Sequence, residues 1–95
     1  MSVHAVLYSK PNCMKCRMTY NQLSKAMHVK VEKLFDPESQ NTEWSNRKIE
    51  KFRAQGYNAM PVLRIYDDQT GERLDDWCDM QKDKIDFWKK AISGE

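Results

Sequence analysis

The sequence predicts an α/β fold, with a four-stranded mixed sheet and flanking helices in the order β-α-β-α-β-β-α. Short segments rich in β-branched and aromatic residues alternate with segments whose apolar residues recur every three or four positions. The three prolines and the first two glycines fall between these segments. Two parallel strands joined by a helix, then a helix and an antiparallel hairpin, would build a small sheet covered by helices.

The first part of the chain predicts two strands joined by a helix. Residues 3–8 are mostly apolar on both alternating faces, which predicts a strand buried between layers. Residues 13–27 contain no glycine or proline, and their apolar side chains form one predicted helical stripe of Cys16, Tyr20, Leu23 and Met27. Residues 29–35 alternate in polarity and predict a half-exposed strand.

A polar connection and a second helix follow. Asp36 and Pro37 suit the cap and the first position of a helical turn. Residues 44–55 predict a basic helix that directs Ile49 and Phe52 inward. Gly56 predicts its end, because glycine is the commonest residue just past a helix.

The last part predicts a hairpin and a helix. Residues 61–66 predict a strand, residues 67–71 a hairpin loop, and residues 72–77 a more charged edge strand. Residues 81–92 predict a helix that aligns Ile85, Trp88 and Ile92. We assign Trp44, Phe87 and Trp88 to packing.

The composition predicts one folded domain over residues 1–95. Hydrophobic residues make up 40% of the chain and charged residues 32%, which is not a disordered composition. Sixteen basic and fourteen acidic side chains give a net charge of +2, so we do not expect a nucleic-acid partner. No run approaches the ~18 apolar residues of a membrane span, and no signal peptide is evident. We therefore expect a cytoplasmic monomer with no membrane partner.

Two of the three cysteines, Cys13 and Cys16, lie two residues apart after the first predicted strand. In a reducing compartment such a pair is more often catalytic or metal-binding than structural. The start of a helix at Cys13, with Lys10 and Lys15 nearby, favours the thiolate. We therefore predict that Cys13 attacks a disulfide and that Cys16, one turn later, resolves the mixed disulfide.

Other interpretations of the cysteines remain open. A Cys-x-x-Cys pair is also half of a zinc site, for which Cys78, His4 and His28 are the candidate further ligands. The pair would otherwise be two small buried hydrophobic residues. The two histidines are otherwise expected to be hydrogen-bonded or solvated, since thiol exchange needs no dedicated base.

The segments "YSKPNCMKC", "RAQGYNAMPVL" and "WCDMQKDKI" together resemble the NrdH-redoxins, which are glutaredoxin-like proteins of the thioredoxin fold. The resemblance implies a small electron carrier that passes two electrons to the disulfide of a ribonucleotide reductase. It implies recycling by thioredoxin reductase and no cofactor held by the redoxin itself. It also implies that Pro61 is cis and faces the cysteine pair, with Met60 offering backbone hydrogen bonds to the partner.

Other residues join Met60 and Pro61 as candidate partner-binding residues: Tyr8, Lys10, Met14, Lys15, Trp77 and Cys78. Cys78 stands where related sequences usually have serine, so it is either a third redox thiol or an inconsequential replacement. A glutathione-dependent glutaredoxin is the nearest alternative function, although "WCDM" and "AMP" depart from the residues of its tripeptide groove. A redox-sensing binding protein, like the regulators related to arsenate reductase, is the alternative from another class.

Overall fold

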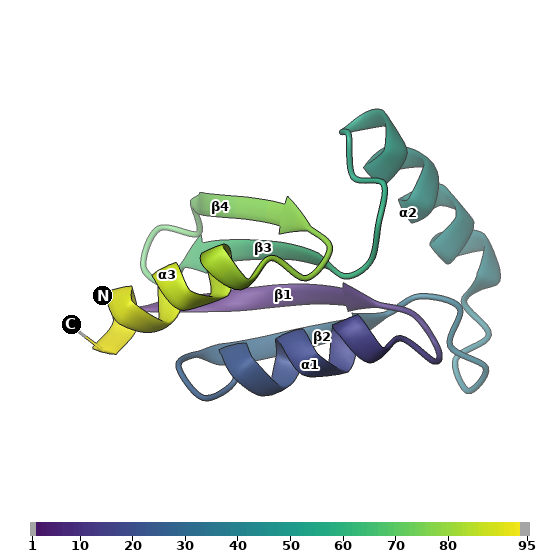
Figure 1. The fold of residues 1–95 in the computed structure, drawn as a ribbon. Helices are drawn as coiled ribbons and strands as arrows, with labels where there is room; N and C mark the ends of the chain where they lie inside the picture. Colours follow the sequence, from purple (N-terminus) through teal and green to yellow (C-terminus); the bar gives the residue numbers. More distant parts are fainter. Residues whose placement is uncertain (1, 94–95) are drawn as a thin grey trace.

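The computed structural model describes residues 2–93 and has the predicted order of elements (Figure 1). In chain order the elements are β1 (Val3–Ser9), α1 (Met14–Leu23), β2 (His28–Lys33), α2 (Thr42–Ala54), β3 (Val62–Asp67), β4 (Arg73–Cys78) and α3 (Lys82–Ser93). The predicted α/β fold with a four-stranded mixed sheet is confirmed. No helix within residues 2–93 is long and apolar enough to cross a membrane.

The sheet has the strand order β2-β1-β3-β4. Strands β1 and β2 are parallel, whereas β3 runs antiparallel to both β1 and β4. Because parallel neighbours need a crossover connection, α1 carries the chain from the end of β1 back to the start of β2. The end of β1, the start of α1, the start of β3 and the end of β4 therefore meet at one end of the molecule (Figure 1).

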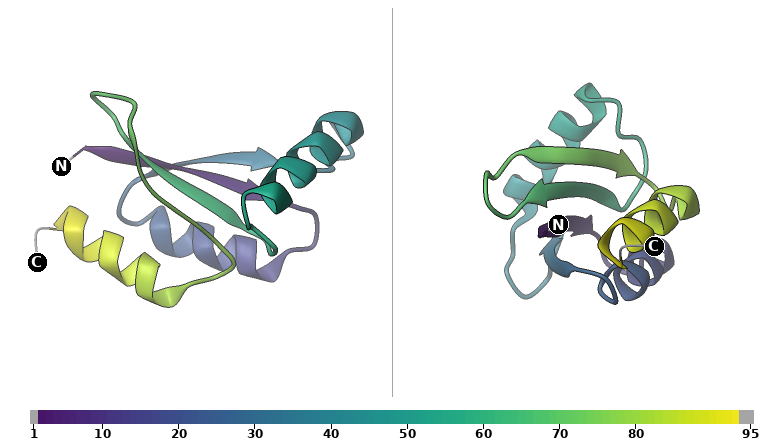
Figure 2. Two further views of the ribbon diagram at one scale, coloured as in Figure 1. Left: turned by 90° about the horizontal axis from the view of Figure 1, so that it is seen from above. Right: turned by 90° about the vertical axis from the view of Figure 1, so that its left-hand side faces the viewer.

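Helices α1 and α3 lie side by side on one face of the sheet (Figure 2). Their apolar residues and the facing side chains of the strands form the main core, which includes Leu7, Leu23, Leu63, Ile65 and Trp88. This burial of apolar surface is the dominant favourable term in folding. The packing of α1 in this core also holds the loop between β1 and α1, which carries Cys13, at one end of the sheet.

Helix α2 lies at one end of the opposite face, where it projects beyond the strands (Figures 1 and 2). A second, smaller core forms there from Tyr8, Leu34, Phe52 and Val62. The prediction that β1 is buried between layers therefore holds only at its end. Nearer the start of β1, His4 and Val6 on the same face are only partly buried.

The predicted apolar stripe of α1 is wrong at one position. Cys16, Thr19 and Leu23 face the sheet, whereas Tyr20 is 40% exposed. Thr19 is fully buried and offers a methyl group to the core. Its hydroxyl is buried too, and it has no hydrogen-bond partner within residues 2–93. The helix also ends at Leu23 rather than at residue 27, because the chain turns over residues 24–26 to enter β2.

The connection after β2 begins earlier than predicted. Phe35 has a positive φ of 55°, which takes it out of the strand, and its N–H donates to the hydroxyl of Ser45 at 2.8 Å. Asp36 caps a single turn as predicted, since its carboxylate accepts from the N–H of Glu38 at 3.1 Å. These bonds hold the start of α2 against the end of β2.

Gly56 ends α2 as predicted. Its φ of +91° is a left-handed conformation that favours glycine, and its N–H donates to the carbonyl of Arg53 at 3.1 Å. The N–H of Tyr57 donates to the carbonyl of Phe52 at 2.8 Å, and the two rings pack edge to face. This is a Schellman motif with its apolar contact, and it directs the chain toward Pro61.

Helix α3 packs through Ile85, Trp88 and Ile92, as predicted. Phe87, which we also assigned to packing, is 59% exposed, so that prediction is wrong. It follows Ile85 by only two positions, which places it on the other side of the helix.

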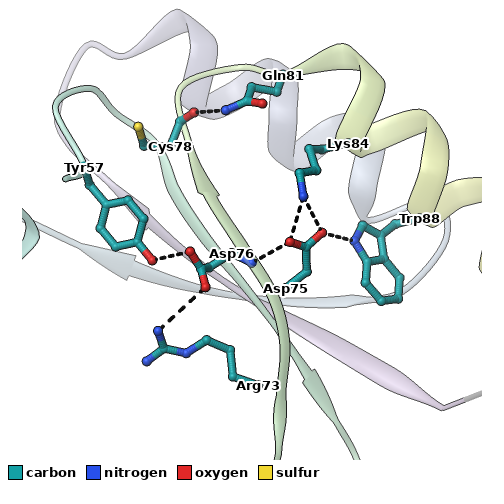
Figure 3. A network of polar contacts seen from close by, with 8 residues as sticks. All are labelled: Tyr57, Arg73, Asp75, Asp76, Cys78, Gln81, Lys84 and Trp88. Carbon is teal, nitrogen blue, oxygen red and sulfur yellow. Dashed lines mark hydrogen bonds and ion pairs between the residues drawn. The ribbon is translucent and has the colours of Figure 1, made fainter. Parts of the chain in front are cut away.

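Asp75 joins β4 to α3 through three contacts (Figure 3). Lys84 donates to its two carboxylate oxygens at 2.8 and 3.0 Å, and the indole N–H of Trp88 donates at 2.9 Å. Burial alone would raise the pKa of Asp75, but the hydrogen bonds from Lys84 and Trp88 outweigh it and bring the pKa below its ordinary value. The ionised carboxylate therefore stabilises the fold.

We expect stability to depend on pH through Asp75. Its pKa is lower in the folded state than in the unfolded state, so its contribution is complete above about pH 4–5 and is lost as pH falls through the folded pKa. Asp75→Asn should cost about 2 kcal/mol in the free energy of unfolding at pH 7, and less at pH 2–3. Urea unfolding of both proteins at the two pH values measures this, and an equal difference at both would contradict it.

Candidate active site

Cys13 is the N-cap residue of α1, as the sequence predicted for the start of that helix. Its backbone is extended, and its sulfur accepts a hydrogen bond from the N–H of Cys16 at 3.1 Å. A sulfur at this position faces unpaired N–H groups and the positive end of the helix dipole. The same contacts would stabilise a thiolate after reduction.

Cys13 and Cys16 are joined by a disulfide bond, with their Cα atoms 5.2 Å apart. Cys13 is 9% exposed and Cys16 is 3% exposed. Cys13 is thus the more exposed of the two residues. Cys16 lies one turn further along the helix, and both cysteines belong to the main core.

The proline loop and the loop after β4 meet beside the cysteine pair. The Met60–Pro61 peptide bond is cis, as the family resemblance implied. The carbonyl of Pro61 accepts from the N–H of Asp79 at 2.8 Å, and the Asp79 carboxylate pairs with Lys15 at 2.9 Å. Lys15 stands between the two cysteines, so this chain of contacts ties all three segments together.

Asp79 lies in the "WCDM" segment, but no local sequence signal distinguishes it as a functional residue. Asp79 has a positive φ of 69°, which aspartate tolerates better than most residues. The hydrogen bond from Lys15, and then that from the N–H of Met80, hold the pKa of Asp79 below its ordinary value. Asp79 is therefore ionised at neutral pH and offsets the charge of Lys15.

Met14 and Met60 differ in their exposure to solvent. Met14 is exposed on the first turn of α1. Met60 is partly buried and packs against both cores, the main one of which contains both cysteines. Lys10 is exposed in the loop before the pair.

Tyr8 and Trp77 lie in the core rather than at the surface. Tyr8 packs edge to face against Phe52 in the second core, with the guanidinium of Arg64 at 5.6 Å from its ring centre. Trp77 belongs to the main core, and Lys84 lies over its ring. These two residues can support the site by packing, whereas their side chains offer little surface to a partner.

Cys78 lies across the sheet from the cysteine pair. It packs against the second core, and its thiol lies 3.8 Å from the amide oxygen of Asn58. His4 is at the start of β1, where its ring contacts the carboxylate of Asp68, and His28 is exposed. Within residues 2–93 no three metal-binding side chains lie close enough to share an ion.

Two cavities flank the site. The larger, of 660 Å³, lies between α2 and the loop before Pro61, and its lining includes Phe35, Arg53, Tyr57 and Met60. The smaller, of 340 Å³, lies between β1, α1 and β2 and borders both cysteines. Lys10 lines both. Neither cavity could be predicted from the sequence, because each is lined by residues that come together only in the folded chain.

No protein-family model matches this chain, and no curated protein matches it either. Solved structures do match. The glutaredoxin-like NrdH-redoxin of Escherichia coli is 19% identical, with a TM-score of 0.61, over 88% of this chain and 92% of that one. The chain has a thioredoxin-like fold.

Two further structures support this assignment of the thioredoxin-like fold. A DsbE, described as a putative thiol:disulfide interchange protein, from Chlorobium tepidum is 15% identical, with a TM-score of 0.63, over 98% of this chain and 79% of that one. A thioredoxin of Schistosoma mansoni is 20% identical, with a TM-score of 0.53, over 96% and 79%. At these identities the thioredoxin-like fold is what the chains share, and function must be argued from the site.

Proposed function

We propose that this protein is a dithiol redoxin that reduces protein disulfides by thiol-disulfide exchange. The observation that carries the proposal is the position of Cys13 at the N-cap of α1, with Cys16 bonded to it one turn behind. This arrangement supplies a stabilised attacking sulfur and a second sulfur within reach. The likeness in fold to a redoxin, a thiol:disulfide interchange protein and a thioredoxin supports the proposal by analogy.

The reaction follows from this division of roles. In the reduced protein the Cys13 thiolate attacks one sulfur of the substrate disulfide, so that a mixed disulfide forms and the other substrate sulfur leaves as a thiolate. The Cys16 thiol then loses its proton and attacks Cys13, and the second substrate sulfur leaves. The substrate gains two electrons, its two sulfurs take up one proton from Cys16 and one from water, and the protein ends with the Cys13–Cys16 disulfide.

The finer proposal is an electron donor to ribonucleotide reductase, recycled by thioredoxin reductase with electrons from NADPH. It is supported by the three sequence segments that resemble the NrdH-redoxins and by the likeness in fold to the Escherichia coli protein. Lys10, Met14, Lys15 and Met60 would contact the partner, whereas Pro61, whose side chain is fully buried, would act by positioning Met60. Such a carrier would work in the cytoplasm, where these reductants keep thiols reduced.

Two recycling assays test this proposal. Both assays contain the oxidised protein, NADPH and insulin as the disulfide substrate. One adds thioredoxin reductase, and the other adds glutathione and glutathione reductase. We expect insulin reduction with thioredoxin reductase at least about tenfold faster than with glutathione. No reduction in either assay, and none by the chemically reduced protein, would overturn the redoxin assignment.

A glutathione-dependent glutaredoxin is the second candidate. The 660 Å³ cavity favours it, because Lys10 and Arg53 on its lining are suited to bind the carboxylates of a tripeptide. Faster turnover with glutathione in the assays above would select this function instead.

A further inference from the structure

The smaller cavity beside the cysteines has features that disulfide exchange alone does not require. We call it the β2-side cavity, defined by Leu7 on β1, Cys16, Arg17 and Tyr20 on α1, and Val31 and Lys33 on β2. It has a volume of 340 Å³ and also borders Cys13. A group bound there would therefore be next to the reacting sulfur.

The charge of this cavity is of one sign. Three of its lining residues are basic, namely Lys10, Arg17 and Lys33, and none is acidic. Within residues 2–93 neither Arg17 nor Lys33 forms an ion pair. Lys15, by contrast, is already paired with Asp79. The cavity thus presents unmatched positive charge beside the active site.

The floor and walls of the cavity are apolar. Leu7 and Cys16 are buried beneath it, whereas Tyr20 and Val31 leave much of their surface open to solvent. An apolar surface rimmed by charge suits a ligand that is itself partly apolar and carries the opposite charge.

The position of Lys33 is fixed by the backbone. Lys33 pairs with Ser9 in the parallel register, and its carbonyl accepts from the side-chain amide of Asn41 at 2.7 Å. Leu7 and Val31 are paired two positions earlier, so they lie on the same face of the sheet as Lys33. The side chain of Lys33 therefore leaves the backbone at the rim of the apolar floor.

We propose that the β2-side cavity binds an acidic segment of the disulfide substrate, with carboxylates toward Arg17 and Lys33 and an apolar side chain over Tyr20 and Val31. This inference rests on the proposed redoxin function and names the substrate class of that site. Strand β2 is an edge strand, so an extended segment can approach the cavity from that side. The cavity has room for one or two side chains of such a segment, and it adjoins Cys13.

The test uses three peptides that contain the same intramolecular disulfide and an adjacent leucine. Glutamates flank the cysteines in the first peptide, glutamines in the second and lysines in the third. We expect the reduced protein to reduce the glutamate peptide about tenfold faster than the glutamine peptide at low ionic strength, and the lysine peptide most slowly. At 0.5 M salt the preference should fall to about twofold, because the charges are exposed.

Matched variants assign the preference to the cavity. Arg17→Gln with Lys33→Gln should remove most of the preference for the glutamate peptide while leaving reduction of the glutamine peptide within about twofold. Lys25→Gln with Lys90→Gln removes the same charge from exposed positions outside the cavity and should keep the preference. An amide NMR titration with a cysteine-free glutamate peptide should shift the signals of Tyr20 and Val31 in the oxidised protein.

The possible failures are distinct. A wild-type protein that reduces the glutamate and glutamine peptides equally, or a cavity variant that keeps the full preference, would overturn the acidic-substrate proposal alone. Glutathione shifting the same NMR signals while the peptide does not would also overturn it. If none of the three peptides is reduced, the redoxin function fails and this inference fails with it.

Discussion

Cys13→Ser is expected to abolish disulfide reduction, with a loss of at least about 1000-fold in turnover. A serine hydroxyl is not ionised at neutral pH, so the helix start that would stabilise a thiolate at this position has no anion to stabilise. Insulin reduction by the chemically reduced variant measures the loss. Residual turnover within tenfold of the wild type would show that another sulfur performs the attack.

Cys16→Ser should fail in a different way. Cys13 still attacks, but the mixed disulfide is not resolved from within the protein, so a covalent adduct with the substrate accumulates. Mass spectrometry of the intact protein under non-reducing conditions detects it. Cys78→Ser is the matched comparison, and turnover within about twofold of the wild type is expected because the Cys78 thiol lies across the sheet. An adduct with Cys13→Ser instead would reverse the assigned roles.

Phe52→Ala is expected to cause the largest loss of stability, about 3–5 kcal/mol in the free energy of unfolding. Phe52 is 2% exposed and is the buried apolar residue by which α2 contacts the sheet. Its ring packs against Tyr8 and Tyr57, and the guanidinium of Arg64 lies over it at 5.5 Å. Its removal leaves a cavity at the centre of the second core, which the surrounding residues fill only in part.

Phe87→Ala is the control for this measurement, because it removes the same atoms from a side chain that is 59% exposed. We expect a change within about 0.5 kcal/mol. Urea unfolding at pH 7 gives both values. Equal losses for the two variants would mean that the second core does not hold α2 in place.

Much of the fold could be predicted from local patterns. The order of strands and helices follows from periodicity and from the placement of proline and glycine, and Gly56 illustrates why. Its left-handed conformation is strained for other residues, so glycine there marks the helix end in the sequence itself. The position of Cys13 at the start of α1 could be predicted in a similar way. The loop before it contains Pro11, which marks the end of the preceding strand in the sequence itself.

The side of a helix that faces the core was less predictable. Tyr20, which periodicity places on the stripe of α1, and Phe87, an aromatic residue expected to pack, are both exposed. Thr19 was left out of the stripe and is fully buried. Periodicity identifies a stripe only to within about one position, since residues i+3 and i+4 lie about 60° and 40° to either side of residue i around the helix axis. Packing against the sheet decides which of them is buried.

The sequence by itself determined the residues on which the proposed chemistry depends: two cysteines at a strand-to-helix junction, with a proline before the third strand. These signals are local, because they depend on residues close together in the chain. Only the tertiary structure decided which side chains surround that chemistry. Distant segments come together in each case: Asp79 pairs with Lys15, Cys78 packs against the second core across the sheet, and Arg17 and Lys33 line the same cavity. They depend on the strand order and on which face each helix covers, and these properties arise from the packing of the whole chain.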